Sequence, residues 1–177
     1  MKASALGFAV AVVVAGLLVT PSSAAPPTLT GKMTKLNYLV GLWNCQTKVP
    51  AMQSMPAHTA KGTASFEVEP GNTVGFRITS ERYSAAGYLG YLDVKQLWWT
   101  SGADNFGGVT FETGKSSSGN VYTINGSSML GGSSVPTRDT ITKASDMKYE
   151  DVYQLQKNGQ WVLGADSVCT KQSRTPD

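Results

Sequence analysis

The chain has 177 residues, of which 15 are basic and 12 acidic, and its formal net charge is +3. The charges are scattered without a run of like sign, whereas a nucleic-acid-binding surface normally carries a basic stripe. One histidine and two cysteines leave little material for nucleophilic catalysis, and the sequence has no Gly-x-Ser-x-Gly elbow. These features predict a protein that is not an enzyme and does not bind nucleic acid.

The first residues have the pattern of a secretory signal peptide. Lys2 supplies a positive charge, an apolar run covers 6–19, and small residues precede a cleavage site after Ala24. The apolar run is too short for a membrane span, and no later segment resembles one. We therefore expect a signal peptide over 1–24, a flexible lead-in over 25–30, a single domain over 31–172 and a tail over 173–177. The protein is expected to be exported, to the periplasm or outside the cell.

The rest of the chain predicts an all-β fold behind one short helix. Apolar residues at helical spacing (Leu29, Met33, Leu36 and Val40) indicate a helix ending at Gly41, which would plug one end of a barrel. Beyond it, alternating segments between turn signals predict ten strands, over 42–49, 57–69, 73–83, 88–93, 97–101, 107–113, 121–127, 138–143, 148–156 and 161–171. The Ser/Gly-rich segment 114–120 is expected to be an exposed turn. Ten strands joined by hairpins would form a closed up-and-down antiparallel barrel.

The two cysteines support this closure. Trp43 lies two residues before Cys45, and Lys171 lies two residues after Cys169. An antiparallel pairing of the first and last strands that opposes the cysteines therefore also opposes Trp43 and Lys171. Two cysteines in an exported chain predict one disulfide, the alternative being two free buried thiols. The sequence thus predicts a barrel stapled shut, with a basic side chain lying over a tryptophan.

Leu39-Val40-Gly41-Leu42-Trp43, a short helix running into Gly-x-Trp, resembles the start of lipocalin-like (calycin) barrels. Lys171 matches the basic residue that packs across that tryptophan in those families. The mature chain as a whole resembles an uncharacterised bacterial lipocalin-like domain family with a Leu-x-Gly-x-Trp start. The resemblance implies the barrel fold and little about chemistry, because one fold hosts many functions.

Strand alternation suggests what the barrel would enclose. In the segment 148–156, Tyr149, Asp151, Tyr153 and Leu155 share one face, and Trp161, Leu163 and Ala165 are expected to face inward from the last strand. The candidate ligand-binding residues are therefore Phe66, Phe76, Arg82, Tyr149, Asp151 and Tyr153. They would suit a small, partly apolar or lipid-like molecule with a carboxylate or hydroxyl headgroup. The alternative is a barrel filled by its own side chains, with Arg82 paired to Asp151, that meets a protein partner through surface tyrosines and tryptophans.

A third hypothesis concerns metal. Met52, Met55 and His58 follow the first strand at regular spacing, and thioether and imidazole ligands suit copper. Accidental spacing is the competing interpretation, so no cofactor is expected. Some ten-stranded barrels that the chain resembles bind haem through an inward histidine on a late strand. This sequence has its one histidine at position 58, and we therefore do not expect haem.

Overall fold

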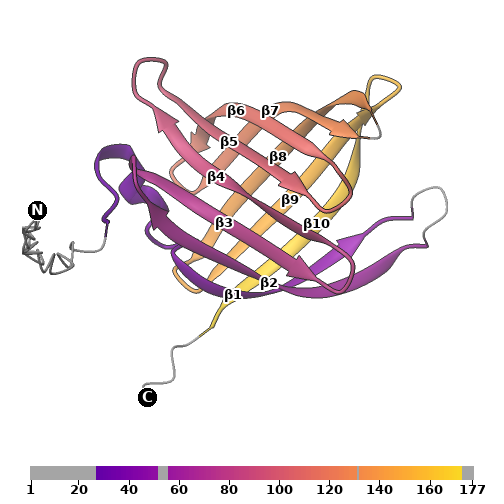
Figure 1. Cartoon of the computed structure of the whole chain (residues 1–177), viewed down its shortest axis with the longest axis horizontal. Helices are drawn as coiled ribbons and strands as arrows, with labels where there is room; N and C mark the ends of the chain where they lie inside the picture. The colour runs from indigo at the N-terminus through magenta and orange to yellow at the C-terminus, as the bar shows by residue number, and fades with distance from the viewer. Residues whose placement is uncertain (1–26, 52–55, 131, 173–177) are drawn as a thin grey trace, which may run out of the picture.

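A computed structural model describes residues 27–51, 56–130 and 132–172. The predicted signal peptide and C-terminal tail lie outside the described residues, as do Met52 and Met55. Ten strands form a closed antiparallel barrel in which each strand pairs with its neighbours in the chain and β1 pairs with β10 (Figure 1). The predicted fold class, an all-β closed up-and-down barrel, is therefore confirmed. No helix in the described ranges is long and apolar enough to cross a membrane.

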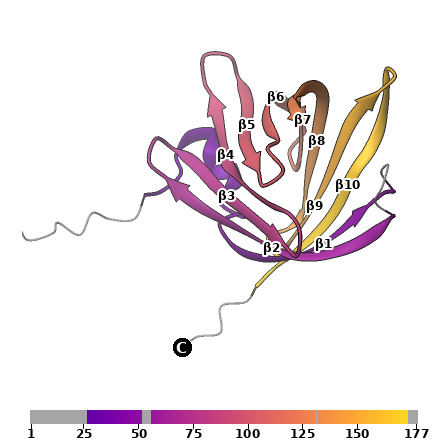
Figure 2. The same cartoon turned by 45° about the vertical axis from the view of Figure 1, so that its right-hand side comes forward.

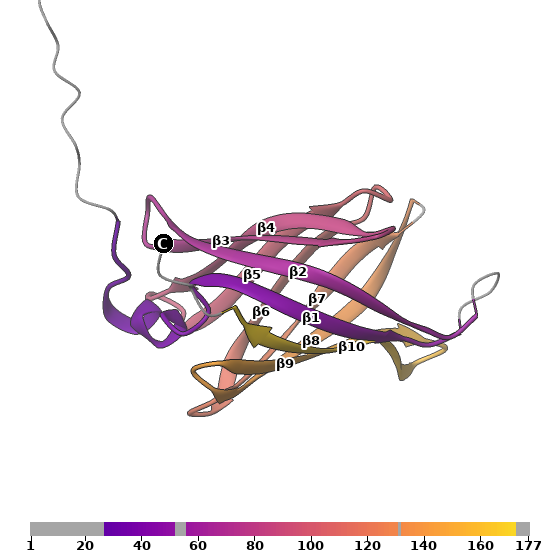
Figure 3. The same ribbon diagram turned by 90° about the horizontal axis from the view of Figure 1, so that it is seen from below.

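The elements follow the predicted order. One 3-10 helix and ten strands make up the fold: η1 (Gly31–Leu36), β1 (Gly41–Val49), β2 (His58–Glu69), β3 (Thr73–Ser80), β4 (Ser84–Leu92), β5 (Leu97–Asp104), β6 (Val109–Ser118), β7 (Val121–Leu130), β8 (Ser133–Ser145), β9 (Lys148–Lys157) and β10 (Gln160–Lys171). The expected N-terminal helix is thus a short 3-10 turn. Its apolar residues Met33 and Leu36 are buried, so it covers one end of the barrel (Figure 3).

The first and last strands meet as the cysteine spacing predicts. β1 and β10 lie side by side (Figure 2). Cys45 is opposite Cys169 and Trp43 opposite Lys171, and the cysteines form a disulfide. The Lys171 ammonium lies 5.2 Å from the centre of the Trp43 ring and donates a hydrogen bond of 2.8 Å to the carbonyl of Tyr38. Trp43 is fully buried, and its Nε1 donates to the carbonyl of Leu39 at 2.6 Å. This clasp fixes the register between β1 and β10.

Two predicted turns are placed differently in the structure. The turn after β3 covers 81–83, closed by a hydrogen bond of 2.8 Å from the Ser80 amide to the Tyr83 carbonyl, and β4 already begins at Ser84. The segment 114–120 is mostly strand, because β6 continues to Ser118 and only Gly119 and Asn120 turn the chain. Local Ser/Gly composition predicted a loop there, but pairing with β7 stabilises the extended backbone instead.

A β-bulge corrects the predicted face of β10. The register of β10 against β9 shifts between Leu163 and Ala165, which places Gly164 as the extra residue. A side chain at Gly164 would collide with the Tyr153 ring, since its Cβ would lie 2.7 Å from Cδ1. The bulge reverses the alternation, so Trp161 lies on the outer face, 4.5 Å from the Arg138 guanidinium, and Leu163 is exposed. The prediction that Trp161 and Leu163 face inward is wrong.

The core is concentrated at the end that η1 covers. Buried side chains there come from η1 and from strand positions near it, and they include Met33, Leu39, Trp43, Phe66, Val74, Trp98, Tyr122 and Tyr149. Tyr149 packs edge-on against Trp43 and Phe66, with ring centres 4.8 and 5.9 Å apart. Inward side chains farther from η1, such as Ile78 and Leu155, are only half-buried. The apolar core is therefore packed at the η1 end. Toward the opposite end, which we call the mouth, Ile78 and Leu155 are half-buried and the polar side chains of Glu112, Ser128 and Thr137 are buried.

Candidate functional site

The predicted ligand-binding residues divide between the two halves of the barrel. Phe66 and Tyr149 point inward but belong to the packed core beside η1. Phe76 is half-buried and also packs against this core, with its ring centre 6.5 Å from that of Phe66. Asp151 and Tyr153 share the inward face of β9 and are half-buried. The structure thus brings together two of the candidates and assigns three to packing.

Arg82 does not join this group. β3 ends at Ser80, and Arg82 is exposed in the turn that follows, where its carbonyl accepts a hydrogen bond from Asn105. The ion pairs between described residues join Lys143 to Asp146 and Lys148 to Glu150. The expected pairing of Arg82 with Asp151 is therefore absent, because the strand ends before its alternation reaches residue 82.

Two carboxylates that the sequence analysis missed lie beside Asp151. Thr100 opposes Glu112 on β6, and Ile124 opposes Asp139 on β8, so both acids share the inward face with Asp151 on β9. Glu112 is fully buried. We call Glu112, Asp139 and Asp151 the acidic cluster. The apolar side chains of β6 mask it in the sequence, since Val109 and Phe111 would be expected to face inward.

A glycine on β7 lets the cluster form across a strand. Gly126 lies opposite both Glu112 on β6 and Thr137 on β8. A Cβ at Gly126 would lie 2.6 Å from the Cα of Glu112 and would collide with the backbone of β6. Because Gly126 has no side chain, the Thr137 hydroxyl reaches across the inward face of β7 and donates a hydrogen bond of 2.5 Å to Oε1 of Glu112. The Glu112 carboxyl group is also hydrogen-bonded to the Asp139 side chain, so the two acids share a proton.

Burial controls the ionisation of the cluster. Desolvation raises the pKa of Glu112, opposed by the hydrogen bond from Thr137, and raises that of Asp139 well above its ordinary range, with Asp151 and Glu112 adding to the effect. Desolvation, with the neighbouring charges of Glu112 and Asp166, raises the pKa of Asp151 to about 7. The acids therefore retain protons at a pH at which exposed carboxyl groups are ionised.

This predicts an unusual pH dependence of stability. A carboxyl group whose pKa is raised by folding binds more protons in the folded state, so its contribution is present at low pH and is lost as the pH rises. For Asp151 the interval runs from its ordinary value of 3.8 to about 7. We expect the melting temperature to fall as pH rises through this interval and the Asp151→Asn variant to flatten the fall. Thermal unfolding followed by circular dichroism checks this, and a melting temperature that rises over the interval would contradict it.

The mouth carries an aromatic pair above the cluster. Tyr83, in the turn between β3 and β4, stacks on Phe106, in the turn between β5 and β6, with ring centres 6.4 Å apart. Burial of the Tyr83 hydroxyl, with Asp104, Tyr153 and Asp139 adding to it, raises its pKa to about 12. Tyr83 is 39% exposed and Phe106 73% exposed, so the pair lies on the surface at the mouth end, with the Tyr83 hydroxyl near the inward acids.

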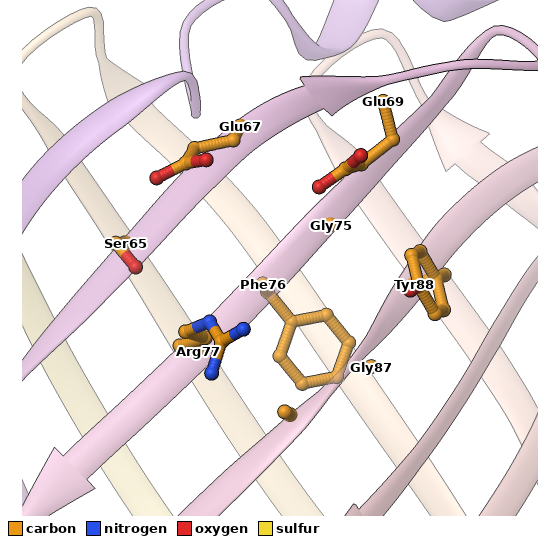
Figure 4. A pocket seen from close by; sticks show the side chains of 9 residues that line it. Ser65, Glu67, Glu69, Gly75, Phe76, Arg77, Gly87 and Tyr88 are labelled. Atoms are coloured by element: carbon orange, nitrogen blue, oxygen red, sulfur yellow. The ribbon is translucent and has the colours of Figure 1, made fainter.

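Two hollows lie outside this region. A small one of about 20 Å³ lies between η1 and the strands, lined by Leu36, Leu39, Leu89 and Trp98 among others, and has room for little more than one water molecule. A larger one of about 160 Å³ is a groove on the outer face of β2, β3 and β4. Figure 4 shows Glu67 and Glu69 beside it on β2 and Arg77 on β3. Opposite charges side by side on an exposed sheet face are common, so this groove does not indicate a ligand class.

The predicted copper loop is only partly described. His58 begins β2, is exposed, and has its Nδ1 3.0 Å from the carbonyl oxygen of Pro56. Met52 and Met55 lie outside the described residues. Copper binding by Met52, Met55 and His58 therefore stays a prediction.

No protein-family model matches the sequence, and no curated protein is similar to it. Among solved structures, Rv2717c from M. tuberculosis superposes with a TM-score of 0.62 at 15% identity, over 82% of this chain and 100% of that one. A redesigned β-barrel superposes with a TM-score of 0.39 at 11% identity, over 81% of this chain and 100% of that one. The likeness to Rv2717c supports the barrel fold and does not extend to the particular lipocalin-like family that the Leu-x-Gly-x-Trp motif resembles.

Proposed function

We propose that this protein is an exported, non-catalytic barrel that binds a small, partly apolar molecule in the mouth half of its interior. The observation that carries the proposal is the contrast between the two ends. Side chains such as Trp43 and Tyr149 beside η1 are buried, whereas Tyr153 and Leu155 face inward farther from η1 and retain accessible surface, as does Ile78 at the edge of the core. A concave, mainly apolar interior with a few polar groups is the usual form of a small-molecule site.

The competing hypothesis is a barrel filled by its own side chains, with Arg82 paired to Asp151. Arg82 is instead exposed, and Oδ1 of Asp151 is buried without a hydrogen-bond partner in the described part of the chain. A buried polar atom without a partner costs free energy, and a ligand or water that supplies one would relieve that cost. This favours an occupant over a solid interior.

Export rests on the sequence and on the disulfide. The predicted signal peptide directs the chain out of the cytoplasm, and the Cys45–Cys169 bond is consistent with an oxidising compartment. A carrier outside the cytoplasm would protect a partly apolar molecule from water during transfer.

A tryptophan placed in the interior tests the proposal. Ile78 on β3 points inward, and its neighbour Thr79 is exposed on the outer face. We expect the neutral dye N-phenyl-1-naphthylamine to bind the wild-type protein saturably, with fluorescence enhancement. The Ile78→Trp variant should bind it about tenfold more weakly because the larger ring occupies the interior, and the control Thr79→Trp should bind it as the wild type does. No saturable binding to the wild type, or equal binding by both variants, would contradict the proposal.

A further inference from the structure

The acidic cluster is not compensated by any basic group nearby. Among the described residues, neither Glu112, Asp139 nor Asp151 has an ion pair. Lys143 lies on the inward face but at the η1 end, where its ammonium contacts Asp146 and the Tyr38 ring. His58 and Lys157 are at strand ends toward the mouth and are exposed. Protonation, and not a protein cation, therefore keeps these buried acids neutral, and Asp151 carries an uncompensated charge once the pH exceeds its pKa of about 7.

One acid of the cluster has a buried oxygen without a partner. Glu112 and Asp139 are hydrogen-bonded to each other through their side chains, so one proton serves both. Oδ1 of Asp151 is buried and receives no hydrogen bond within the described ranges. A carboxylate oxygen is an acceptor, so the missing partner is a hydrogen-bond donor.

On β6, the strand that supplies Glu112, apolar side chains face outward and the acidic side chain faces inward. On β6 the apolar Val109 and Phe111 are 54% and 56% exposed, whereas Glu112 between Phe111 and Thr113 is 0% exposed. Folding alone would favour the opposite arrangement, with apolar side chains inside. Such local conflicts between sequence and fold are expected at functional sites, and this one places a buried carboxyl group beside Asp151.

Tyrosines surround the cluster. Tyr153 lies directly opposite Asp139 on the inward face, and its hydroxyl is 3.3 Å from that of Ser128. Tyr38 is buried, and its hydroxyl has no hydrogen-bond partner among the described residues. Aromatic faces attract cations, particularly where water is excluded. No group of three carboxylate, histidine or cysteine side chains in the described part of the chain converges as a metal-ligand set. An organic cation, with its charge at one end of an apolar body, therefore fits better than a bare metal ion.

We propose that the occupant is a protonated amine, whose ammonium donates a hydrogen bond to Asp151 while its apolar body extends toward Phe76 and Ile78. This rests on the proposed function and specifies its ligand class. An ammonium offers hydrogen-bond donors and one positive charge, which match the unpartnered oxygen of Asp151 and the negative charge that this group carries when it is ionised. It reverses the sequence-based expectation of a carboxylate headgroup, which depended on Arg82.

Three probes of similar size and different charge test the ligand class. They are 2-phenylethylamine, which is a cation, the neutral 2-phenylethanol, and the anion 3-phenylpropanoate. Isothermal titration of the mature protein at about pH 8, above the pKa of about 7 of Asp151, measures each affinity. We expect the amine to bind at least about tenfold more tightly than the alcohol, because charge-assisted hydrogen bonds are the stronger ones, and the anion to bind least.

Two variants locate the effect. Asp151→Asn should reduce the preference for the amine over the alcohol to about threefold or less, since it removes a charge but retains the shape. Glu150→Gln is the matched control, because Glu150 is the neighbouring residue on β9 and forms an ion pair with Lys148 on the outer face. It should leave the preference unchanged. Asp151→Asn should fold, because it removes a buried charge without changing the side-chain volume.

The outcomes separate the two proposals. Equal or tighter binding of the alcohol or the anion would overturn the amine assignment and leave the proposed carrier function standing. Failure of all three probes, together with failure of the neutral dye, would overturn both proposals. An amine preference that Asp151→Asn and Glu150→Gln change equally would place the cation elsewhere on the protein and overturn the assignment to the acidic cluster.

Discussion

Replacing Cys45 and Cys169 together by serine is expected to lower the free energy of unfolding by about 4–5 kcal/mol, because the disulfide closes a loop with a sequence separation of 124. For a chain of this size, such a loss corresponds to a fall in melting temperature of roughly 10–20 °C. The barrel should nevertheless form, since β1 and β10 also pair through their backbones and through Trp43 and Lys171. Thermal unfolding by circular dichroism measures the shift.

A neighbouring cross-strand pair provides the control. Thr47 on β1 and Ser167 on β10 join the same two strands through a hydrogen bond of 2.9 Å between their hydroxyls. Replacing both by alanine removes this contact but retains the disulfide, and should cost only about 1 kcal/mol. If the double-serine variant melts at the wild-type temperature, the disulfide does not stabilise the fold.

Trp43→Ala is expected to destabilise the protein by about 4 kcal/mol. The side chain is fully buried, and its removal leaves a cavity at the packed end of the core. It also removes the edge-on contact with Tyr149, the hydrogen bond to the Leu39 carbonyl and the partner of the Lys171 ammonium. Chemical denaturation followed by circular dichroism measures the change in the free energy of unfolding.

Trp161→Ala is the matched control for this substitution. Trp161 lies on the outer face, where it contacts the Arg138 guanidinium 4.5 Å from its ring, and its loss should cost about 1 kcal/mol. Equal losses in the two variants would show that the clasp of Trp43 and Lys171 contributes no more than an ordinary surface contact. They would also contradict the assignment of Trp161 to the outer face.

The closure of the barrel could be predicted because it depends on residue spacing alone. Trp43 lies two residues before Cys45 and Lys171 two residues after Cys169, so an antiparallel register that opposes the cysteines also opposes Trp43 and Lys171. This register does not depend on the other side chains of the two strands. The inward face of β9 was equally predictable, since Tyr149, Asp151 and Tyr153 alternate with Lys148 and Glu150 without interruption.

The acidic cluster was not predictable from hydrophobic alternation, because β6 reverses that pattern. Phe111 faces outward and Glu112 inward for reasons that lie in the pairing with β5 and β7, not in the strand itself. The sequence placed Trp161 on the wrong face of β10, because the bulge at Gly164 reverses the inward and outward alternation of the residues that precede it in the strand. Counting the register from the buried Trp98, which lies opposite Gly114, would have placed Glu112 on the inward face.

The central claim is that the mouth half of the barrel holds a small molecule. Mass spectrometry of the mature protein from its own host, under native and then denaturing conditions and without added ligand, tests this most directly. We expect a discrete extra mass that is lost on denaturation and that is absent from the Ile78→Trp variant. A bare mass under native conditions, equal to that of the disulfide-bonded chain alone, would contradict the claim and favour a barrel filled by its own side chains.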